Sequence, residues 1–379
     1  MRILIALSRF TLGGTETYSV AVAEQLERLG HTVTLHAVEA NAHGRELADS
    51  RGLRLAVGDP ADLDAVDAAL IQDAASAYRL AGCQPGVPQV FVIHGLAAFE
   101  HPPADPPPTV VALNDRIARH AEALASRPKV VRLRQPIDLE QFRPRGASRE
   151  RARRVLLLSN YLDGPRMRLL KEVCRDLELE LTRLGSAGKP TIAPQAAMTD
   201  ADIVVGYGRS IVEAMAMGRA AYVWDRAGGD GWVTSDNYAA LEADGFAGAA
   251  TGDVIDGERL RADFAAYRPE LGTFAFDLAR VHHSSAKHAE ALLGLFDQAG
   301  APADGEAIET LARLVRLEFR AAVWAGGLEV ENRRLREELE EARERADAAE
   351  SAAAKAEGSS RPMKHRILGT RRRRKDVAP

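Results

Sequence analysis

Short apolar runs alternate with segments of helical periodicity along most of the first 300 residues. The clearest helical segment is 15–30, in which Tyr18, Val22 and Leu26 recur at helical spacing and Gly30 suits a C-terminal cap. Strands that alternate with helices predict a parallel sheet covered by helices on both faces. Four apolar runs in this part are predicted as buried strands: 2–7, 31–38, 87–95 and 108–114.

A polar, arginine-rich stretch at 137–154 interrupts the alternation and is interpreted as an interdomain linker. Beyond it a second α/β unit is predicted, and the helical pattern at 277–296 is expected to close it. Two consecutive doubly wound units predict a cleft between them, with ligands beyond the carboxyl ends of the strands. The predicted elements of the second unit are strands at 154–160, 200–208 and 220–225 and a helix at 167–179.

The fold class is therefore α/β, with two Rossmann-like doubly wound domains that face a cleft and a helical, coiled-coil extension after them. The N-terminal domain is predicted at 1–147 and the second domain at 148–300. A helical and coiled-coil region is predicted at 301–358, and a basic, disordered tail at 359–379.

The helical region begins with an amphipathic pattern at Ile308, Leu311, Val315 and Phe319. A heptad repeat follows, and its charged flanks predict self-association through a coiled coil. A single solvated helix held by ion pairs between neighbouring turns is the alternative. The heptad d positions are Leu328, Leu335, Ala342 and Ala349, and the a positions are Asn332, Leu339, Ala346 and Ala353.

The tail carries eight Lys or Arg side chains and no acid between Arg361 and Lys375. Such a segment is expected to give weak contact with an anionic membrane. Nucleic acid is a less favoured partner, because no aromatic residues are interleaved for base stacking. A plain solubilising tail is the remaining alternative.

The whole chain has 379 residues, is 46% hydrophobic and has a formal net charge of −4, which excludes global charge attraction to nucleic acid or membrane. Cys83 and Cys174 match no metal or redox spacing and suit a reducing compartment. The N-terminus lacks the pattern of a signal peptide, and no apolar run approaches ~20 residues. We expect a cytoplasmic protein, peripheral at the inner face of the membrane if the tail binds lipid.

The stretch Val204–Asp225, VVGYGRSIVEAMAMGRAAYVWD, is typical of a strand, a tight glycine turn, a helix and a second strand. Glycines before a helix leave its N-terminus open to a small anion, and Glu213 is then suited to binding a neighbouring hydroxyl. The alternative is that the glycines serve close packing and Glu213 is solvated.

The loop after the first strand, SRFTLGGTETY, contains Gly13, Gly14 and Glu16 but no G-x-G-x-x-G pattern. Its absence argues against an oxidoreductase that uses a nicotinamide or flavin cofactor. The two adjacent glycines still expose backbone N–H groups to a diphosphate, although a plain strand–helix turn is the alternative.

Together these residues resemble the glycosyltransferases of GT-B fold, most closely the large retaining family four. The likeness covers about residues 1–297, and the order of its motifs is more specific than any one of them. Four stretches carry it: LGGTE after the first strand, VIHG around His94, PIDLEQFRP from Pro136 to Pro144, and IVEAMAMGRAAYV from Ile211 to Val223.

The resemblance implies a nucleotide-sugar donor bound by the second domain. Glu213 matches the second glutamate of the family's Glu-x7-Glu signature, which binds ribose hydroxyls, whereas Val205 stands at the position of the first. The family's Arg-x4-Lys pair, which stabilises the leaving diphosphate, is matched in spacing by Arg166 and Lys171, with Arg168 as a competitor. The other implied donor-binding residues are Gly13, Gly14, Gly208, Arg209, Ser210 and Asp230.

On the acceptor side, the resemblance implies catalytic His94, near the reacting hydroxyls, and Glu16. Asp230 lies in GGDGW, predicted as a glycine loop at the cleft, and His282 and His283 are interpreted as packing or surface residues. The implied activity is transfer of a sugar to a glycan or lipid-linked acceptor, with retention of configuration, no cofactor and no metal. A nucleotide-sugar epimerase is disfavoured by the motif order. The alternative is a catalytically degenerate protein that binds nucleotide or glycan and acts as an oligomeric scaffold.

Overall fold

Seven parallel strands form the first sheet, in the order β3-β2-β1-β4-β5-β6-β7. Successive residues of β1 point to opposite faces, so that Ile3 and Ile5 belong to one core and Leu4 and Ala6 to another. Both faces of the sheet are therefore buried. The strands are β1 (Arg2–Phe10), β2 (Thr32–Ala40), β3 (Arg54–Val57), β4 (Ala68–Ile71), β5 (Gln89–Ile93), β6 (Thr109–Ala112) and β7 (Lys129–Arg132).

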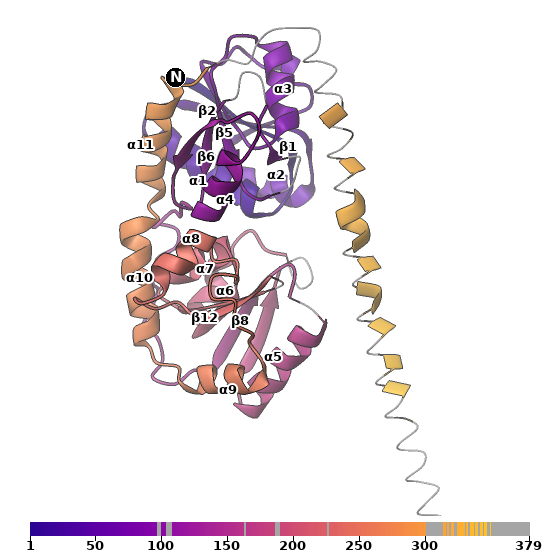
Figure 1. Cartoon of the computed structure of the whole chain (residues 1–379), viewed down its shortest axis with the longest axis vertical. Coiled ribbons are helices and arrows are strands. Elements are labelled where there is room, and N and C mark those ends of the chain that lie inside the picture. Colours follow the sequence, from indigo (N-terminus) through magenta and orange to yellow (C-terminus); the bar gives the residue numbers. More distant parts are fainter. Residues whose placement is uncertain are drawn as a thin grey trace, which may run out of the picture. The chain divides into compact units, whose positions relative to one another are not determined.

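The helices that connect these strands cover the two faces of the first sheet (Figure 1). Asn41, Asp73 and Asn114 each cap the following helix by accepting a hydrogen bond from a backbone N–H in its first turn. The helices are α1 (Gly14–Arg28), α2 (Ala42–Asp49), the 3₁₀ turn η1 (Pro60–Asp62), α3 (Ala74–Cys83) and α4 (Asp115–Glu122).

The computed structural model describes residues 1–96, 100–103, 108–162, 164–185, 190–225, 227–300 and scattered helical residues between 314 and 349. The chain divides into two units, Met1–Ala325 and Gly326–Pro379. Both sheets belong to the first unit, and we call the parts built on them the first half and the second half.

The second sheet has the order β12-β11-β10-β8-β9, and β12 alone pairs antiparallel, with β11. The strands are β8 (Arg154–Leu158), β9 (Glu180–Leu184), β10 (Ile203–Gly206), β11 (Ala220–Asp225) and β12 (Gly228–Trp232). The helices of this half are α5 (Gly164–Asp176), α6 (Gln195–Asp200), α7 (Arg209–Ala216), α8 (Tyr238–Asp244), α9 (Gly257–Ala265) and α10 (Glu270–His282).

The prediction of a glycine loop at 228–232 is wrong, because these residues form β12. A Cβ at Gly229 would clash with the side chains of Trp224 and Ile255, so glycine is needed here for the hairpin to pack on its own core. The short strands β3, β4, β7 and β9 are also not predicted from the sequence; each has only four or five residues, and β3, β7 and β9 begin with a charged residue.

The predicted helix at 277–296 is two helices, α10 and α11 (Ser285–Phe296), separated at His283. Leu292, Leu295 and Phe296 of α11 pack in the core of the first half, against residues of β1 and α1. Figure 1 shows α11 beside the first sheet and α10 beside the second. From the sequence, both segments are predicted to belong to the second domain. Apolar periodicity shows that a helix has a buried face, but it does not show that the two helices face different cores.

The two halves are joined where the chain crosses between them twice, side by side. The N–H of Ile137 donates to the carbonyl of His283 at 2.8 Å, and the N–H of Ser285 donates to the carbonyl of Ile137 at 3.1 Å. The His283 ring is buried, with Nδ1 bonded to Gln135 O at 2.8 Å and Nε2 to the Tyr238 hydroxyl at 2.9 Å. His283 is therefore a packing residue of the crossing, as the sequence analysis interpreted it.

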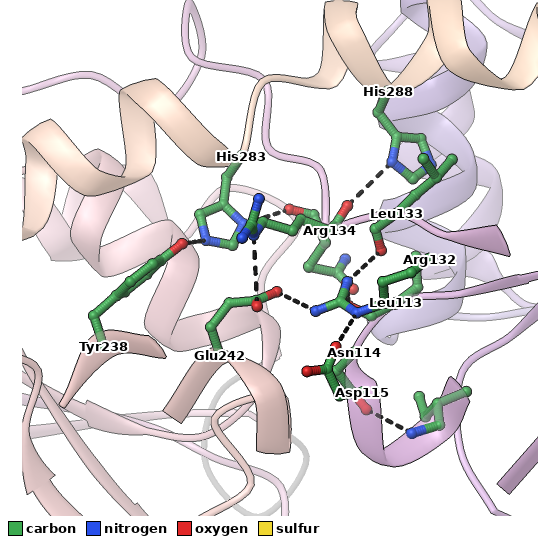
Figure 2. A network of polar contacts seen from close by, with 12 residues as sticks. Leu113, Asn114, Asp115, Arg132, Leu133, Arg134, Tyr238, Glu242, His283 and His288 are labelled. Atoms are coloured by element: carbon green, nitrogen blue, oxygen red, sulfur yellow. Dashed lines mark hydrogen bonds and ion pairs between the residues drawn. The ribbon is translucent and has the colours of Figure 1, made fainter. Parts of the chain in front are cut away.

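Beside the crossing, Arg132 of β7 binds Glu242 of α8 across the two halves, with 2.5 Å between Nη2 and Oε1 (Figure 2). Nη1 of Arg132 donates to the Leu113 and Leu133 carbonyls, each at 2.8 Å, and Nε donates to Asp115 Oδ1 at 2.7 Å. Arg134 lies 3.5 Å from the second carboxylate oxygen of Glu242. Glu242 is buried, so this ion pair links the halves in a region largely shielded from water.

The extension after residue 300 is described only in part. Its described residues include helical Leu328, Leu335 and Leu339, each about half exposed, and Arg334 pairs with Glu331 and Glu338 on neighbouring turns. Most of the predicted amphipathic pattern, Ala353 and the basic tail lie outside the described residues, and self-association stays a prediction. Where the structure describes the chain, no helix is long and apolar enough to cross a membrane.

Replacing Leu292 by Ala is expected to destabilise the first half although the residue follows the second in sequence. Leu292 is fully buried, and removing a leucine from such a site costs about 2–5 kcal/mol. Urea unfolding measures the loss, with Glu290→Ala, an exposed position on the same helix, as control. Equal stability of the two variants would contradict the packing of α11 on the first sheet.

Candidate functional site

A cavity of about 640 Å³ lies between the halves, at the carboxyl ends of both sheets. The strand order reverses between β1 and β4 in the first sheet and between β8 and β10 in the second. Such switch points are where ligands of doubly wound sheets bind. The cavity is lined there by 11–15 after β1, 158–161 at the end of β8, and 207–210 after β10.

On the second half, the N-terminus of α7 opens onto this cavity. Gly208 precedes the helix with φ +55°, a conformation that favours glycine, and its N–H donates to the Phe246 carbonyl at 2.8 Å. No side chain caps the helix at Gly208. The Ser210 hydroxyl instead binds Tyr207, accepting from its N–H at 3.1 Å and donating to its carbonyl at 2.8 Å. The helix start is thus open to an anion.

Arg209 and Glu213 form a buried ion pair on α7, with 2.9 Å between Nε and Oε1. Their side chains are only 11% and 8% exposed. Burial raises the pKa of the Glu213 carboxyl, and the Arg209 guanidinium opposes that rise. Arg209 also donates to the Pro136 carbonyl at 2.9 Å, so it fixes α7 to the crossing between the halves. The sequence analysis named both residues but not their pairing.

His94 lines the cavity from the end of β5, as predicted. Its Nε2–H donates to Gln72 Oε1 at 2.6 Å, and its ring lies edge-on to Tyr18 with 4.9 Å between centroids. Burial, together with the nearby charge of Arg209, lowers the pKa of His94 to about 3. The ring is therefore neutral at physiological pH, and Nδ1 is left as its acceptor nitrogen.

Glu100 also lines the cavity on this side, and the sequence analysis does not single it out. Its carboxylate accepts hydrogen bonds from the backbone N–H groups of Gly95 and His94. Burial nevertheless raises the pKa of Glu100 to about 6. No spacing signal marks this residue, and its hydrogen bonds with Gly95 and His94 are what place it beside them.

Two tyrosines that the sequence analysis does not single out stand on the second half of the cavity. Tyr161 follows β8 and Tyr207 follows β10, and their rings meet edge-on with 5.6 Å between centroids. The two rings come together because β8 and β10 are adjacent in the sheet. The two tyrosines are 46 positions apart in the sequence, so the sequence does not reveal this contact.

Several predicted site residues do not line the cavity. Glu16 is buried, and its carboxylate accepts hydrogen bonds from the N–H and hydroxyl of Thr11 in the same loop. In contrast, Gly13 and Gly14 line the cavity as predicted donor-binding residues would. Asp230 is buried in β12, where it accepts two hydrogen bonds from Thr251.

The predicted cations Arg166 and Lys171 lie on α5 and are also outside the cavity lining. Val205, at the position of the family's first glutamate, is fully buried in β10, so that position faces the core and not the cavity. Among the described residues, no group of three or more His, Cys, Asp or Glu side chains could hold a metal ion. The absence of a metal requirement stays a prediction.

No protein-family model matches the chain, and no curated protein sequence matches it. Solved structures do. A glycosyltransferase from Rickettsia africae ESF-5 is similar at a TM-score of 0.53 and 13% identity, over 78% of this chain and 98% of that one. An α-glucosyltransferase in complex with UDP and DNA is similar at 0.52 and 12% identity, over 78% and 99%. A pneumococcal O-GlcNAc transferase in complex with UDP and GlcNAc is similar at 0.52 and 9% identity, over 79% and 99%.

The chain has the GT-B fold. At these identities the likeness concerns the fold, and assignment to the retaining family four stays a prediction. This chain covers the similar structures almost completely, and the shared fold includes both sheets.

Glu100→Gln is expected to stabilise the protein at neutral pH. A carboxyl whose pKa rises from 4.5 to about 6 contributes stability that is complete below pH 4.5 and is lost as the pH rises through 6. Glutamine does not ionise, so the variant does not lose this stability as the pH rises. Its free energy of unfolding is therefore expected to exceed that of the wild type by about 1–2 kcal/mol at pH 7.5 but not at pH 4.5. Urea unfolding at both pH values measures the difference.

Glu122→Gln, at an exposed site on α4, is the control for that experiment. A constant difference between Glu100→Gln and the wild type at both pH values would show that the carboxyl is not desolvated.

Proposed function

We propose that the protein is a glycosyltransferase that moves a sugar from a nucleotide-sugar donor to a hydroxyl acceptor. The observation that carries the proposal is the uncapped N-terminus of α7, with Glu213 one turn into the helix, at the switch point of the second sheet and open to the cavity. This arrangement suits a diphosphate beside a ribose, and the structures similar to this chain include transferases in complex with UDP.

The donor is proposed to lie on the second half. The backbone N–H groups of Arg209 and Ser210, in the first turn of α7, bind phosphate oxygens, and Glu213 accepts from ribose hydroxyls through Oε2, because Oε1 is held by Arg209. Tyr161 and Tyr207 stand at the same side of the cavity and offer aromatic surface to the nucleobase.

The acceptor is proposed to enter from the first half, which contributes Gly13, Gly14, His94 and Glu100 to the cavity. In the reaction the bond between the anomeric carbon and the β-phosphate oxygen breaks, and its electron pair leaves with the diphosphate. The acceptor hydroxyl oxygen forms the new bond to that carbon, and its proton passes to an oxygen of the departing diphosphate. Stabilisation of the diphosphate charge is the main contribution expected of the protein.

The finer features of the proposal follow the resemblance to family four: retention of configuration, no metal requirement, and a glycan or lipid-linked acceptor. Peripheral membrane contact through the basic tail and self-association through the helical extension are proposed with them. The alternative is still a catalytically degenerate scaffold. It is favoured by Val205, a buried residue at the position of the family's first glutamate, because β10 then offers no carboxylate there.

A panel of nucleotide-sugars, with release of nucleoside diphosphate as the readout, tests the proposal. We expect release with one donor class and faster release once an acceptor glycan is added. Release should persist in EDTA, and the product should keep the donor's anomeric configuration by NMR. Nucleotide binding without any release over the whole panel would favour the scaffold.

Glu213→Gln is expected to weaken nucleotide binding about tenfold to a hundredfold, because a hydrogen bond to a charged group contributes roughly 1.5–3 kcal/mol. Glutamine keeps the length of the side chain, and its carbonyl oxygen still accepts from Arg209. Titration calorimetry with UDP and TDP measures the loss. Glu258→Gln, an exposed first-turn glutamate on α9, is the matched control. Equal affinities for the two variants would remove Glu213 from the site.

A further inference from the structure

The cations that line the cavity differ from those implied by the family pattern. Within the described residues, the arginines of the lining are Arg51, Arg116 and Arg209, whereas Arg166 and Lys171 of α5 do not contribute to it. A leaving diphosphate gains negative charge as the sugar departs, and a cation in contact with it is worth most at that moment. In the part of the chain that the structure describes, the candidates for this cation are therefore the lining arginines.

Arg209 and Arg51 are poorly suited to this task. Arg209 is held on both sides, by Glu213 and by the Pro136 carbonyl, so its position is fixed and its charge is already paired with a buried carboxylate. Arg51 follows α2 and pairs with Glu24 of α1 at 3.6 Å, so its ion pair lies within the first half. Its side chain is only 21% exposed.

Arg116 lies in the first turn of α4 and faces the second half. The side-chain amide of Asn114, two residues earlier, packs so closely on Gly245 that a Cβ there would clash with it. The next residue, Phe246, accepts the hydrogen bond from the N–H of Gly208, which precedes α7. The start of α4 is thus linked to the N-terminus of α7 through Gly245 and Phe246, and Arg116 lines the same cavity as Gly208.

The Arg116 guanidinium is weakly held in this position. Its contact across the halves is an ion pair with Asp244, with 3.5 Å between Nε and Oδ1, and Nε has no hydrogen-bond partner although it is buried. The side chain as a whole is 39% exposed. A phosphate at the start of α7 would replace this long ion pair by charge-assisted hydrogen bonds, which are shorter and stronger.

We infer that Arg116, supplied by the first half, is the cation that contacts the donor diphosphate and stabilises it as the leaving group. The inference rests on the proposed function. It makes catalysis depend on both halves at once, because the helix N-terminus comes from one half and the cation from the other.

The test compares Arg116→Ala with Arg119→Ala, an exposed arginine on the same helix. Calorimetry with pyrophosphate, UDP and UMP measures binding without catalysis. We expect Arg116→Ala to bind pyrophosphate and UDP at least tenfold more weakly and UMP with little change. Turnover of the donor identified by the panel is expected to fall ~100-fold, a loss typical of removing one charge-stabilising donor. Arg116→Lys should restore part of it.

Asp244→Asn separates this role from a merely structural contact between the halves. The variant breaks the ion pair with Arg116, while the remaining oxygen still accepts from the N–H groups of Ala247 and Ala249. If Arg116 only joins the halves, Asp244→Asn should reproduce the losses of Arg116→Ala. If Arg116 binds the diphosphate, Asp244→Asn keeps or improves the affinity for UDP.

Two results would overturn the inference while the wild type is active: Arg116→Ala that behaves like Arg119→Ala, or Asp244→Asn that behaves like Arg116→Ala. A wild type that neither binds UDP nor turns over any donor would instead overturn the proposed function, and the inference with it.

Discussion

The geometry of the cavity depends on the hydrogen bonds between the two chain crossings. Both the N–H and the carbonyl of Ile137 are bonded to the returning segment, to His283 and Ser285 respectively. Because buried backbone groups must keep such partners, the two segments cannot slide past each other independently. Arg209 binds Pro136, the neighbour of Ile137, so the start of α7 is fixed to the same point. The position of the helix N-terminus relative to the first half follows from these few contacts.

The polar groups around His94 are poorly suited to stabilising the fold. Glu100 is held in surroundings that disfavour its charged form, and Gln72, which accepts from His94, leaves its own amide nitrogen buried without a partner. Isolated polar groups of this kind cost free energy when they are removed from water. Their clustering at the carboxyl ends of β4 and β5 is typical of a site whose residues serve a ligand.

Electrostatic complementarity joins the halves on one side of the cavity. The first half presents Arg116, Arg132 and Arg134, and the second presents Glu242 and Asp244. Arg132 is held by close hydrogen bonds and acts as a fixed contact, whereas Arg116 makes only a long ion pair. The same surface therefore contains a structural ion pair and an arginine that is free to exchange its carboxylate partner for a ligand.

The amino-acid sequence by itself determined the α/β class, the two doubly wound units and the strand–glycine–helix motif around Gly208 and Glu213. These features are local, because a strand pattern, a helical pattern or a glycine turn depends only on residues that are close in sequence. Only the tertiary structure decided that α11 returns to the first sheet and that 228–232 is a strand, since both depend on which core a segment meets. His94 and Glu213 line the cavity because they lie at or just after the carboxyl ends of strands. The predicted site residues Arg166, Lys171 and Asp230 do not line it, and motif spacing alone could not reveal this. Arg116 faces the second half through a contact with Asp244, which is distant in sequence, and no pattern along the chain encodes such a contact. Glu100 lies only five residues from Gly95, but no motif marks it.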